Sequence, residues 1–457
     1  MSSSVDNAGQ LDERSIRKIA GLSLVGASVE WFDFFLYGTA AALVFPHLFF
    51  PKVDPATGVL LSFATFGVGF VARPVGGIIW GHFGDRLGRK KAFLAALLTM
   101  AAGSVLIGLL PGYAAIGVAA PILLTALRFV QGLAVGGQWG GAVLLATEYA
   151  PPRKRGLYGS MAQIGVPVGV LLGTVAYFFL SLGMSQEAFL AYGWRIPFVA
   201  SVALVGVAIY AHRKLEETPA FLRLQQLAAQ QAAAGVVSRS PVLEVLRTSW
   251  RRVLLAGGAF TVVNTTFYIY ITFIQDYGVR ILHMPKSTVL LAIAIVSVLQ
   301  IPALAGFAAI SDRIGRRKMY LAGAIGTAIW AFPLFWLVDT GTGWGMTLGL
   351  FGGQLVLSMM YGPLAAFFAE LFNARLRYSG ASLAYQIAGV LGGALAPIIS
   401  LALLHHFHSA LAVSVYVAAA LALTVVSLLL APETRDVDLH SVHDDEQRIL
   451  AADARRS

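Results

Sequence analysis

Ionisable side chains occur inside the long apolar segments of this chain, and their types and spacing indicate chemistry. Glu30, Asp33 and Tyr37 follow one another at helical spacing in one apolar segment, so a helix places them on one face. Two close carboxylates in apolar surroundings cannot both stay charged at low cost, so the pair can exchange a proton near neutral pH. We take Asp33, the deeper of the two acids, as the first candidate. The structural alternative is that one acid pairs with an arginine of a neighbouring segment.

Arg128 is the second group with evident chemistry, and it lies in another apolar segment. Gln131 and Gln138 follow it at roughly helical spacing and complete a polar stripe. A guanidinium can hold a carboxylate of a solute through two parallel hydrogen bonds. It can equally neutralise Asp33 or Glu30, because a buried charge requires a partner in either case. The sequence leaves both roles open, and an exchange between them would couple a proton to a solute.

Other polar side chains within apolar segments are weaker candidates for contact with a solute. For any one of them, a hydrogen bond to a neighbouring helix is the commoner role. The predicted substrate-binding set is Arg128, Tyr37, Gln131, Gln138, Gln163, Asn264, Tyr268 and Tyr361.

The sequence offers little for enzymatic or metal chemistry. It has no cysteine and no Gly-x-x-x-x-Gly-Lys-[Ser/Thr] phosphate loop. His405, His406 and His408 form a cluster without acid or thiolate partners, so we expect no metal site. We therefore predict that the protein is not an enzyme and needs no cofactor. We expect a proton gradient to supply its energy.

Composition places the chain in the membrane. Of its 457 residues, 57% are hydrophobic and 12% are charged, whereas soluble domains have about 25% charged residues. The net charge of +10 would suggest nucleic acid in a soluble protein. Here the basic residues cluster in loops, as the positive-inside rule requires of cytoplasmic loops, so we expect a lipid bilayer and no nucleic acid as partner.

The fold class predicted is an all-α membrane protein with twelve transmembrane helices in two six-helix bundles. A membrane-spanning helix needs about 20 mostly apolar residues. The candidate spans are 21–45, 59–80, 92–111, 115–147, 157–182, 192–212, 253–280, 288–310, 319–338, 345–370, 379–404 and 409–430. The loops that follow even-numbered spans carry most of the arginine and lysine, which predicts that both termini are cytoplasmic.

A charged loop between two spans occurs twice, about half the chain apart. Its copies are Gly84–Lys91, which contains Asp85, Arg86 and Arg89, and Ser311–Lys318, which contains Asp312, Arg313 and Arg316. A Glu-x-x-x-x-Arg-x-Arg pattern repeats as well, with Glu148 and Arg155 in the first copy and Glu370 and Arg377 in the second. The repeats indicate a duplicated six-helix unit with its solute site between the halves.

We predict that these charged side chains form gates. An aspartate in a basic loop can pair with arginine or cap a neighbouring helix N-terminus. Glu148 with Arg155, and Glu370 with Arg377, would be further latches. The alternative is that the loops only set topology, but topology does not require an acid in a basic loop.

The predicted organisation has five parts. They are a cytoplasmic tail over 1–20, a six-helix bundle over 21–212, a cytoplasmic linker over 213–252, a second six-helix bundle over 253–430 and a cytoplasmic tail over 431–457. One such bundle pair suffices for transport, so we expect a monomer to function.

The charged loop at Gly81–Lys91 resembles the motif between helices two and three of the major facilitator superfamily. A narrower resemblance is to its metabolite:proton symporter family. The segments that carry it are Glu30–Gly38, Ala72–Gly77, Arg128–Gly132, Gly136–Gly141 and Gly193–Phe198. One departure is Gln138, where relatives usually have glutamate, and the change removes an acidic partner there.

This resemblance implies a proton-coupled transporter in a bacterial cytoplasmic (inner) membrane that works by alternating access. Known members carry shikimate, α-ketoglutarate, citrate and other carboxylates, or zwitterions such as proline and betaine. The expected function is import of a small organic acid together with H⁺. The alternatives are a zwitterion symporter and a uniporter or exporter of the same fold.

Overall fold

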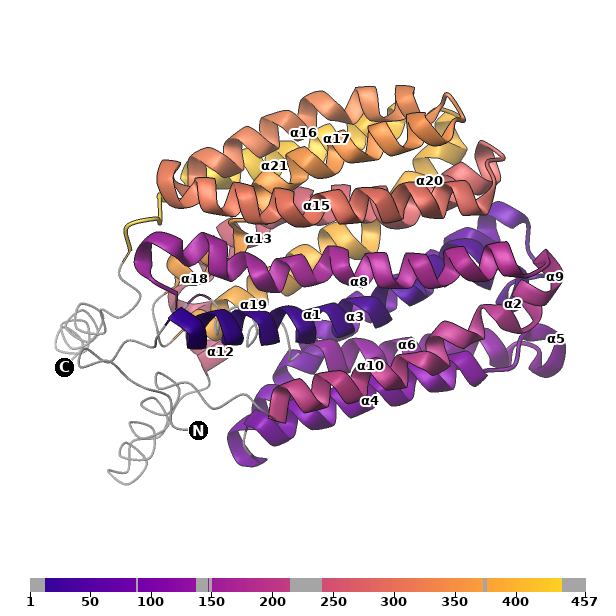
Figure 1. The fold of residues 1–457 in the computed structure, drawn as a ribbon, viewed down its shortest axis with the longest axis horizontal. Helices are drawn as coiled ribbons and strands as arrows, with labels where there is room; N and C mark the ends of the chain where they lie inside the picture. Colours follow the sequence, from indigo (N-terminus) through magenta and orange to yellow (C-terminus); the bar gives the residue numbers. More distant parts are fainter. Residues whose placement is uncertain are drawn as a thin grey trace.

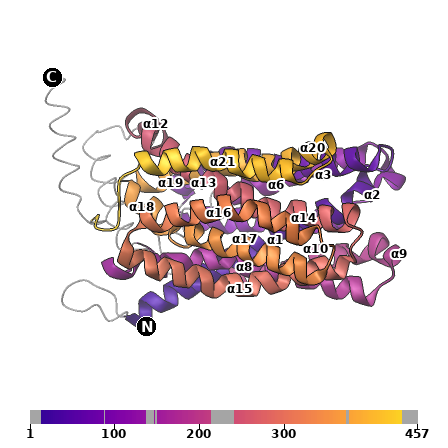
Figure 2. The same ribbon diagram turned by 90° about the horizontal axis from the view of Figure 1, so that it is seen from above.

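The computed structural model of the 457-residue chain describes residues 13–87, 89–136, 147, 150–213, 241–372 and 376–437. Every regular element within these ranges is a helix. The long helices run side by side along the longest axis of the molecule, as both views show (Figures 1 and 2). A bundle of parallel apolar helices satisfies its own backbone hydrogen bonds, which is the condition for crossing a bilayer.

The first half of the chain supplies six long helices. They are α1 (Glu13–Leu43), α3 (Pro55–Leu87), α4 (Arg89–Leu109), α6 (Ala119–Val135), α8 (Arg155–Gly183) and α10 (Arg195–Arg213). Short helices lie between them: α2 (Phe45–Phe49), α5 (Tyr113–Ile116), η1 (Pro152–Lys154), α9 (Gln186–Ala188) and the π-helical η2 (Phe189–Gly193). Each long helix overlaps one of the first six predicted spans.

The second half repeats this plan with more interruptions. Its helices are α13 (Trp250–Tyr268), η3 (Ile269–Phe273), α14 (Ile274–Asp276), η4 (Tyr277–Ile281), α15 (Lys286–Ile314), α16 (Arg316–Val338), α17 (Gly343–Tyr361), α18 (Leu364–Leu371), α19 (Arg377–Ala388), η5 (Gly389–Ala394), α20 (Leu395–Phe407) and α21 (Leu411–Leu430). Of the predicted linker, 214–240 lies outside the described residues, and Pro241–Thr248 forms the short helix α12.

Three predicted spans of the second half are not uniform α-helices. The seventh span holds two π-helical turns, the eleventh holds η5, and the tenth is broken between α17 and α18 at Gly362 and Pro363. Pro363 has no N–H to donate to the preceding turn, which weakens the helix at this point. A Cβ on Gly362 would stand 2.7 Å from the carbonyl oxygen of Leu304, so the break is also where α15 approaches closely.

Eight of the described helical segments are long and apolar enough to cross a membrane, and α4 and α6 contain shorter apolar stretches. With α1 and α10, they complete the twelve predicted spans. Large apolar side chains cover the outside of the bundle: Trp344 is 80% exposed and Trp336 is 70% exposed. Such a surface suits lipid rather than water, so the chain is a multi-pass membrane protein.

The two halves meet along α8 and α15, which lie side by side across the middle of the bundle (Figure 1). Glycine permits the equally close approach of α8 to α1, since a Cβ on Gly169 would lie 2.6 Å from the backbone nitrogen of Phe32. We call the end where α1 begins and α21 finishes the termini end, and the opposite end the α9 end.

Candidate substrate and proton site

The acids of α1 are buried in the middle of the first bundle. Glu30 is 7% exposed and Asp33 is 2% exposed, and both lie near the midpoint of their helix. The Asp33 carboxylate accepts a hydrogen bond from the Ser104 hydroxyl of α4, while its other oxygen, Oδ1, has no partner among the described residues. Asp33 is therefore held inside the first bundle by α4.

Hydrogen bonds connect Asp33 to Arg128. The Gln131 amide donates to the Ser104 hydroxyl oxygen over 2.6 Å, and Arg128 Nη1 donates to Gln131 Oε1 over 3.3 Å. Ser104 in turn donates to Asp33. The acid of α1 and the guanidinium of α6 are thus joined through two neutral polar side chains. We call Asp33, Ser104, Gln131 and Arg128 the relay.

A glycine of α4 makes room for the relay. A Cβ on Gly103 would lie 2.7 Å from Cγ of Gln131, closer than side-chain atoms approach one another. The absence of a side chain at this position therefore lets Gln131 lie flat against α4 and reach Ser104.

The guanidinium of Arg128 is stacked on aromatic rings and keeps spare donors. Its central carbon lies 4.2 Å from the ring centroid of Tyr37, 4.3 Å from that of Phe34 and 5.0 Å from that of Phe66. Arg128 is 2% exposed, and its Nε and Nη2 groups have no hydrogen-bond partner among the described residues. Buried donors are normally satisfied, so these N–H groups are free to bind an anion.

Arg73 of α3 has the same surroundings. Its central carbon lies 4.3 Å from the ring centroid of Phe34 and 4.6 Å from that of Phe70. Its Nε and Nη2 groups also lack partners among the described residues. Glu30 is the acid whose charge acts on it. Arg73 is not in the predicted substrate-binding set, and only the structure brings it to this site.

A small aromatic cavity lies between the halves, next to Arg73. The charge of Arg73 acts on Tyr268, one of the residues that line the cavity. The void is about 10 Å³, which is room for about one water molecule. Its lining consists of Trp31, Val166, Phe260, Val263, Asn264, Phe267, Tyr268, Tyr361 and Tyr385. Three of these, Asn264, Tyr268 and Tyr361, belong to the predicted substrate-binding set.

The other described residues of the predicted substrate-binding set do not line this cavity, and each has different contacts. Tyr37 donates its hydroxyl to Thr65 over 2.8 Å and offers its ring to Arg128. Gln163 of α8 is 1% exposed, and its amide nitrogen has no partner among the described residues. Gln138 lies outside the described residues.

Contacts between the halves close the cavity at both ends. Toward the α9 end, Gln275 donates to the Thr39 hydroxyl over 3.2 Å, and Lys286 donates to the Gln186 side chain over 3.1 Å. Toward the termini end, Gln386 donates to the Gly136 carbonyl oxygen over 3.5 Å. The structure is therefore an occluded conformation, and a solute larger than water requires one end to open.

Asp312 is the centre of a charged latch at the termini end. Its two carboxylate oxygens accept the backbone N–H groups of Gly156 and Leu157 over 2.8 and 3.1 Å. These residues begin α8, so an acid of the second half caps a helix of the first half. Asp312 also pairs with Arg316 at 2.8 Å. One acid thus ties both halves together.

The other charged side chains of the second repeat lie beside this latch. Arg316 pairs with Glu370 at 3.2 Å, and the Thr434 hydroxyl donates to the same carboxylate over 2.8 Å. The predicted partner of Glu370 was Arg377. Instead, Arg377 donates to the carbonyl oxygen of Ala369 over 2.8 Å. A guanidinium near a helix end satisfies backbone carbonyls as readily as a carboxylate, and sequence spacing does not distinguish the two.

The segment after α21 crosses the same end of the bundle. The Glu433 carboxylate accepts the backbone N–H groups of Arg316 and Arg317 over 2.8 and 3.1 Å, where α16 begins. Arg155 donates to the Val437 carbonyl oxygen over 2.6 Å, and Arg435 donates to that of Arg313 over 2.6 Å. Glu148 and the side chains of Asp85, Arg86 and Arg89 lie outside the described residues.

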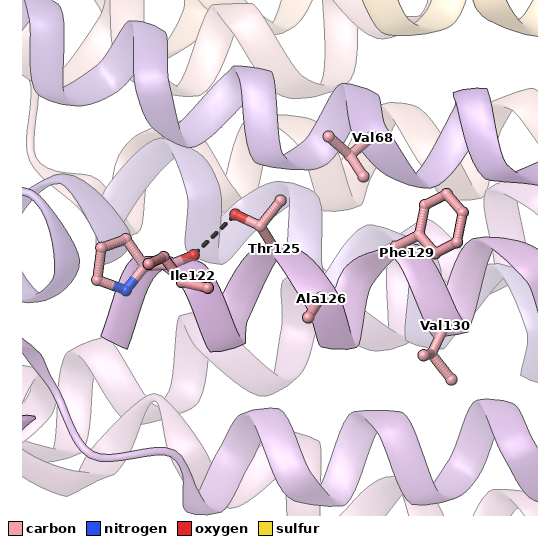
Figure 3. Close-up of a pocket in the computed structure, with 7 residues that line it drawn as sticks. Val68, Ile122, Thr125, Ala126, Phe129 and Val130 are labelled. Atoms are coloured by element: carbon pink, nitrogen blue, oxygen red, sulfur yellow. Dashed lines mark hydrogen bonds between the residues drawn. The ribbon is translucent and has the colours of Figure 1, made fainter. Parts of the chain in front are cut away.

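One surface groove is separate from all of these groups. It lies between α3 and α6, is lined by apolar side chains such as Val68, Ile122 and Phe129, and holds one polar side chain, Thr125 (Figure 3). Thr125 donates to the Pro121 carbonyl oxygen over 2.7 Å. Ile122 is 62% exposed on the outside of the bundle, so the groove faces lipid and not the solute path.

Removal of the latch carboxylate is expected to open the termini end. Hydrogen bonds to a charged group contribute about 1.5–3 kcal/mol each, and Asp312→Ala removes two of them between the halves. Because the chain has no cysteine, a single reporter Ala365→Cys, placed against Gly159 of α8, measures opening by its maleimide labelling rate. We expect Asp312→Ala to raise that rate by about tenfold or more.

The control for the latch is Asp54→Ala. Asp54 caps α3 at the α9 end, where its carboxylate accepts the backbone N–H of Thr57 over 3.0 Å. This variant should leave labelling at position 365 unchanged. Equal labelling in Asp312→Ala and the parent would show that Asp312 does not hold the end closed.

Comparison with known proteins agrees with this twelve-helix architecture, which is that of a membrane transporter. The family model of "Sugar (and other) transporter" matches residues 20–445. The proton:xylose symporter XylE, solved with 6-bromo-6-deoxy-D-glucose, superposes with a TM-score of 0.72 at 18% sequence identity, over 93% of this chain and 97% of that chain. At this identity the likeness shows the fold alone.

Curated relatives match over almost the whole length. The inner membrane metabolite transport protein YhjE of Escherichia coli K12 is 41% identical, over 93% of this chain and 96% of that protein. The shikimate transporter of the same organism is 40% identical, over 93% and 97%. The proline/betaine transporter of Salmonella typhimurium LT2 is 34% identical, over 84% and 77%. The chain belongs to the sugar (and other) transporter family of the major facilitator superfamily, and it is a transporter rather than an enzyme.

Proposed function

We propose that this protein is a proton-coupled symporter that imports a small organic acid by alternating access. The observation that carries the proposal is the relay, which joins the buried acid Asp33 to Arg128, a guanidinium with unused donors. A carboxylate of the solute would bind the free side of Arg128 through two parallel N–H···O bonds. The proton would bind Asp33. The two sites are distinct and in hydrogen-bond contact.

The relay gives a physical reason for coupling. With Asp33 ionised and no solute bound, Arg128 is the counter-charge that acts on Asp33. An arriving anion competes for that positive charge, and a proton on Asp33 removes the competitor. Proton and anion therefore favour each other's binding, which is the reciprocity that any coupling between sites obeys. The proton comes from water on the outer side and leaves to water on the inner side, with no covalent step.

The loaded site would change its access by rocking of the two halves. The occluded conformation has contacts at both ends, so solute must enter and leave through states in which one set is broken. The latch around Asp312 would open for release, and Thr39 with Gln275 would separate for entry. No cofactor is needed, because the proton gradient supplies the energy and one chain contains the whole path.

The basic residues support one orientation of the protein in the membrane. Several of them lie at the termini end: Arg153, Lys154, Arg313, Arg317 and Lys318. By the positive-inside rule, we propose that this end, with both termini, is in the cytoplasm. The membrane is the bacterial inner membrane, in line with the description of YhjE as an inner membrane metabolite transport protein.

The names of the relatives support a metabolite as solute, and the shikimate transporter supports a carboxylate. One observation favours a second candidate, a zwitterion of the proline or betaine type. Aromatic rings surround the central cavity, and such rings bind quaternary ammonium groups. Both candidates place a carboxylate on Arg128.

The test is uptake into proteoliposomes made from the purified protein. A panel of carboxylates that includes shikimate and succinate, together with proline and betaine, is offered with and without an inward proton gradient. We expect accumulation of a carboxylate only with the gradient, together with alkalinisation of the outer medium. Uptake that ignores the gradient, or strict preference for betaine, would contradict the proposal.

Displacement of Gln131 should weaken coupling without touching a charge. Gly103→Ala places a methyl group against Gln131 Cγ and forces its amide away from Ser104. Loss of a buried hydrogen bond costs about 1 kcal/mol or more, so gradient-driven accumulation should fall by about fivefold to tenfold. The matched control is Gly306→Ala in α15, where the new methyl group meets open space. If both variants accumulate the solute equally, Gln131 takes no part in proton coupling.

A further inference from the structure

An exposed row of large apolar side chains crosses from α12 into α13 at the termini end of the bundle, where Figures 1 and 2 both place α12. Leu246, Trp250 and Leu254 follow one another at intervals of four residues, and all three are exposed. Side chains four residues apart in a helix are neighbours on one face. We call these three side chains the apolar row.

Helical spacing continues through the junction of α12 and α13, so the apolar row is a continuous surface. The backbone N–H of Ser249 donates to the carbonyl oxygen of Val245 over 2.8 Å, and that of Val253 donates to the carbonyl oxygen of Ser249 over 3.1 Å. Val245 and Val253 are both buried. One side of the junction therefore packs against the bundle, while the apolar row points outward.

Three arginines border the apolar row. Arg247, Arg251 and Arg252 are exposed, and the guanidinium carbon of Arg251 lies 5.5 Å from the ring centroid of Trp250. None of the three forms an ion pair with a described residue. Glu244 is the only acid in α12 and α13. The junction thus has a net positive charge beside an apolar surface.

The order of these groups along α13 matches the layers at the surface of a bilayer. The apolar span of α13 begins at Trp250, and tryptophan is enriched where membrane meets water. Leu254 lies about one helical turn further into the span. A phospholipid has the same order of groups, a phosphate followed by acyl chains, and arginine binds phosphate through parallel hydrogen bonds.

The charge of the junction selects among phospholipids. The ammonium group of a zwitterionic headgroup is repelled by three positive charges that have no counter-ion in the described protein. A headgroup with a net negative charge has no such penalty, and basic side chains next to a membrane span attract anionic lipids. A free phosphate ion would satisfy the arginines but would leave the apolar row uncovered.

We propose that the junction of α12 and α13 is a binding site for an anionic phospholipid, whose phosphate lies on Arg247, Arg251 and Arg252 and whose acyl chains lie along the apolar row. The lipid would hold α12 at the membrane surface, where the second half of the chain begins. This inference goes beyond the proposed function, since it uses neither the relay nor the identity of the solute.

The test measures which lipid covers the apolar row. Because the chain has no cysteine, Leu254→Cys provides a single site for a bimane label. The labelled protein is reconstituted in phosphatidylcholine that contains either phosphatidylglycerol or phosphatidylcholine with brominated acyl chains, at equal mole fraction. We expect brominated phosphatidylglycerol to associate at least about threefold more strongly, as judged by quenching of the bimane fluorescence.

A second reporter controls for contact with bulk lipid. Ile122→Cys lies on the outer groove between α3 and α6, whose lining is apolar apart from Thr125. Bimane at this position should be quenched equally by the two brominated lipids. Equal quenching at position 254 as well would overturn the inference, because bulk lipid would then cover the row. Quenching by neither lipid at position 254 would also overturn it, because a segment of protein would then cover the row.

Charge variants in the Leu254→Cys background test the arginines. The double variant Arg251→Gln with Arg252→Gln should lower the preference for phosphatidylglycerol to about one. The matched control is Arg153→Gln with Lys154→Gln, which removes two exposed positive charges from the same end of the bundle and should keep the preference. Thermal unfolding of each variant verifies that it is folded. Equal loss of preference in both double variants would show diffuse attraction to the whole surface and refute a site at the junction.

Competition by inorganic phosphate separates a lipid from a free anion. Phosphate added to the parent reporter, against sodium chloride of the same ionic strength, should leave the preference for phosphatidylglycerol unchanged. If phosphate abolishes that preference, the arginines form a site for a free anion and the lipid inference falls.

Discussion

Replacement of Arg128 by lysine is expected to lower kcat/KM for the carboxylate by at least about thirtyfold, and replacement by glutamine at least as much. Removal of one partner from a buried, hydrogen-bonded charge pair costs about 2–5 kcal/mol. Lysine keeps the charge but not the planar fork, so it cannot form the two parallel bonds or remain stacked on Tyr37 and Phe34. The measurement is initial-rate uptake in proteoliposomes over a range of solute concentrations.

Arg195→Lys is the matched control for Arg128. Arg195 also stacks on an aromatic ring, that of Trp194 at 4.5 Å, but its Nη1 already donates to the carbonyl oxygens of Gly108 and Leu110. Its role is to hold α10 to α4 near the α9 end. The control should lower thermal stability and leave KM unchanged. If Arg128→Lys has the KM of the parent protein, Arg128 stabilises the fold and does not bind the solute.

The architecture followed from the sequence because bilayer thickness fixes the length of each apolar segment. All twelve predicted spans overlap described helices, and the family assignment is confirmed. What the sequence did not reveal were the interruptions of the second half. Apolar periodicity carries no signal for the π-helical turns at Ile269–Phe273 and Gly389–Ala394.

The site was predictable only for side chains that are costly in lipid. Asp33, Glu30 and Arg128 were identifiable because a charge in a membrane segment requires a reason. Ser104 was not, although it joins Asp33 to Gln131, because a single serine in an apolar helix usually bonds its own backbone. The role of Arg73 depends on the ring of Phe34, a contact that no spacing rule predicts.

For the latch around Asp312 too, the sequence predicted a role and the structure supplied the contact. The repeat of charged loops predicted that Asp312 has a mechanical role, since a basic loop for topology needs no acid. Only the structure shows that Asp312 caps the N-terminus of α8, because Asp312 and its partner Gly156 are 156 positions apart in the chain. Glu433 and Thr434 follow α21, and their hydrogen bonds with Arg316 and Glu370 hold this segment against the termini end of the bundle.

Asp33→Asn is expected to abolish gradient-driven accumulation while sparing exchange. Asparagine has the shape of a protonated aspartate and can accept the same hydrogen bond from Ser104, so the relay geometry should persist. Its neutral amide holds the site permanently in the state that binds the anion. Solute counterflow, which requires no net proton movement, should therefore continue within a factor of about three, whereas accumulation against a gradient should vanish.

The pH dependence makes this prediction specific. In the parent, uptake should rise as the outer pH falls, because more of Asp33 is protonated on the side from which the solute arrives. In Asp33→Asn the rate should not respond to outer pH, since the variant has no proton to gain there. The control is Asp276→Asn at the α9 end, another buried acid, which Arg280 holds through bonds of 2.9 and 2.8 Å. Because that carboxylate already has its counter-charge on the same helix, its loss should cost stability but keep the slope with pH. If the uptake rate of Asp33→Asn still depends on outer pH and that of Asp276→Asn does not, the proton site lies in the second half of the chain.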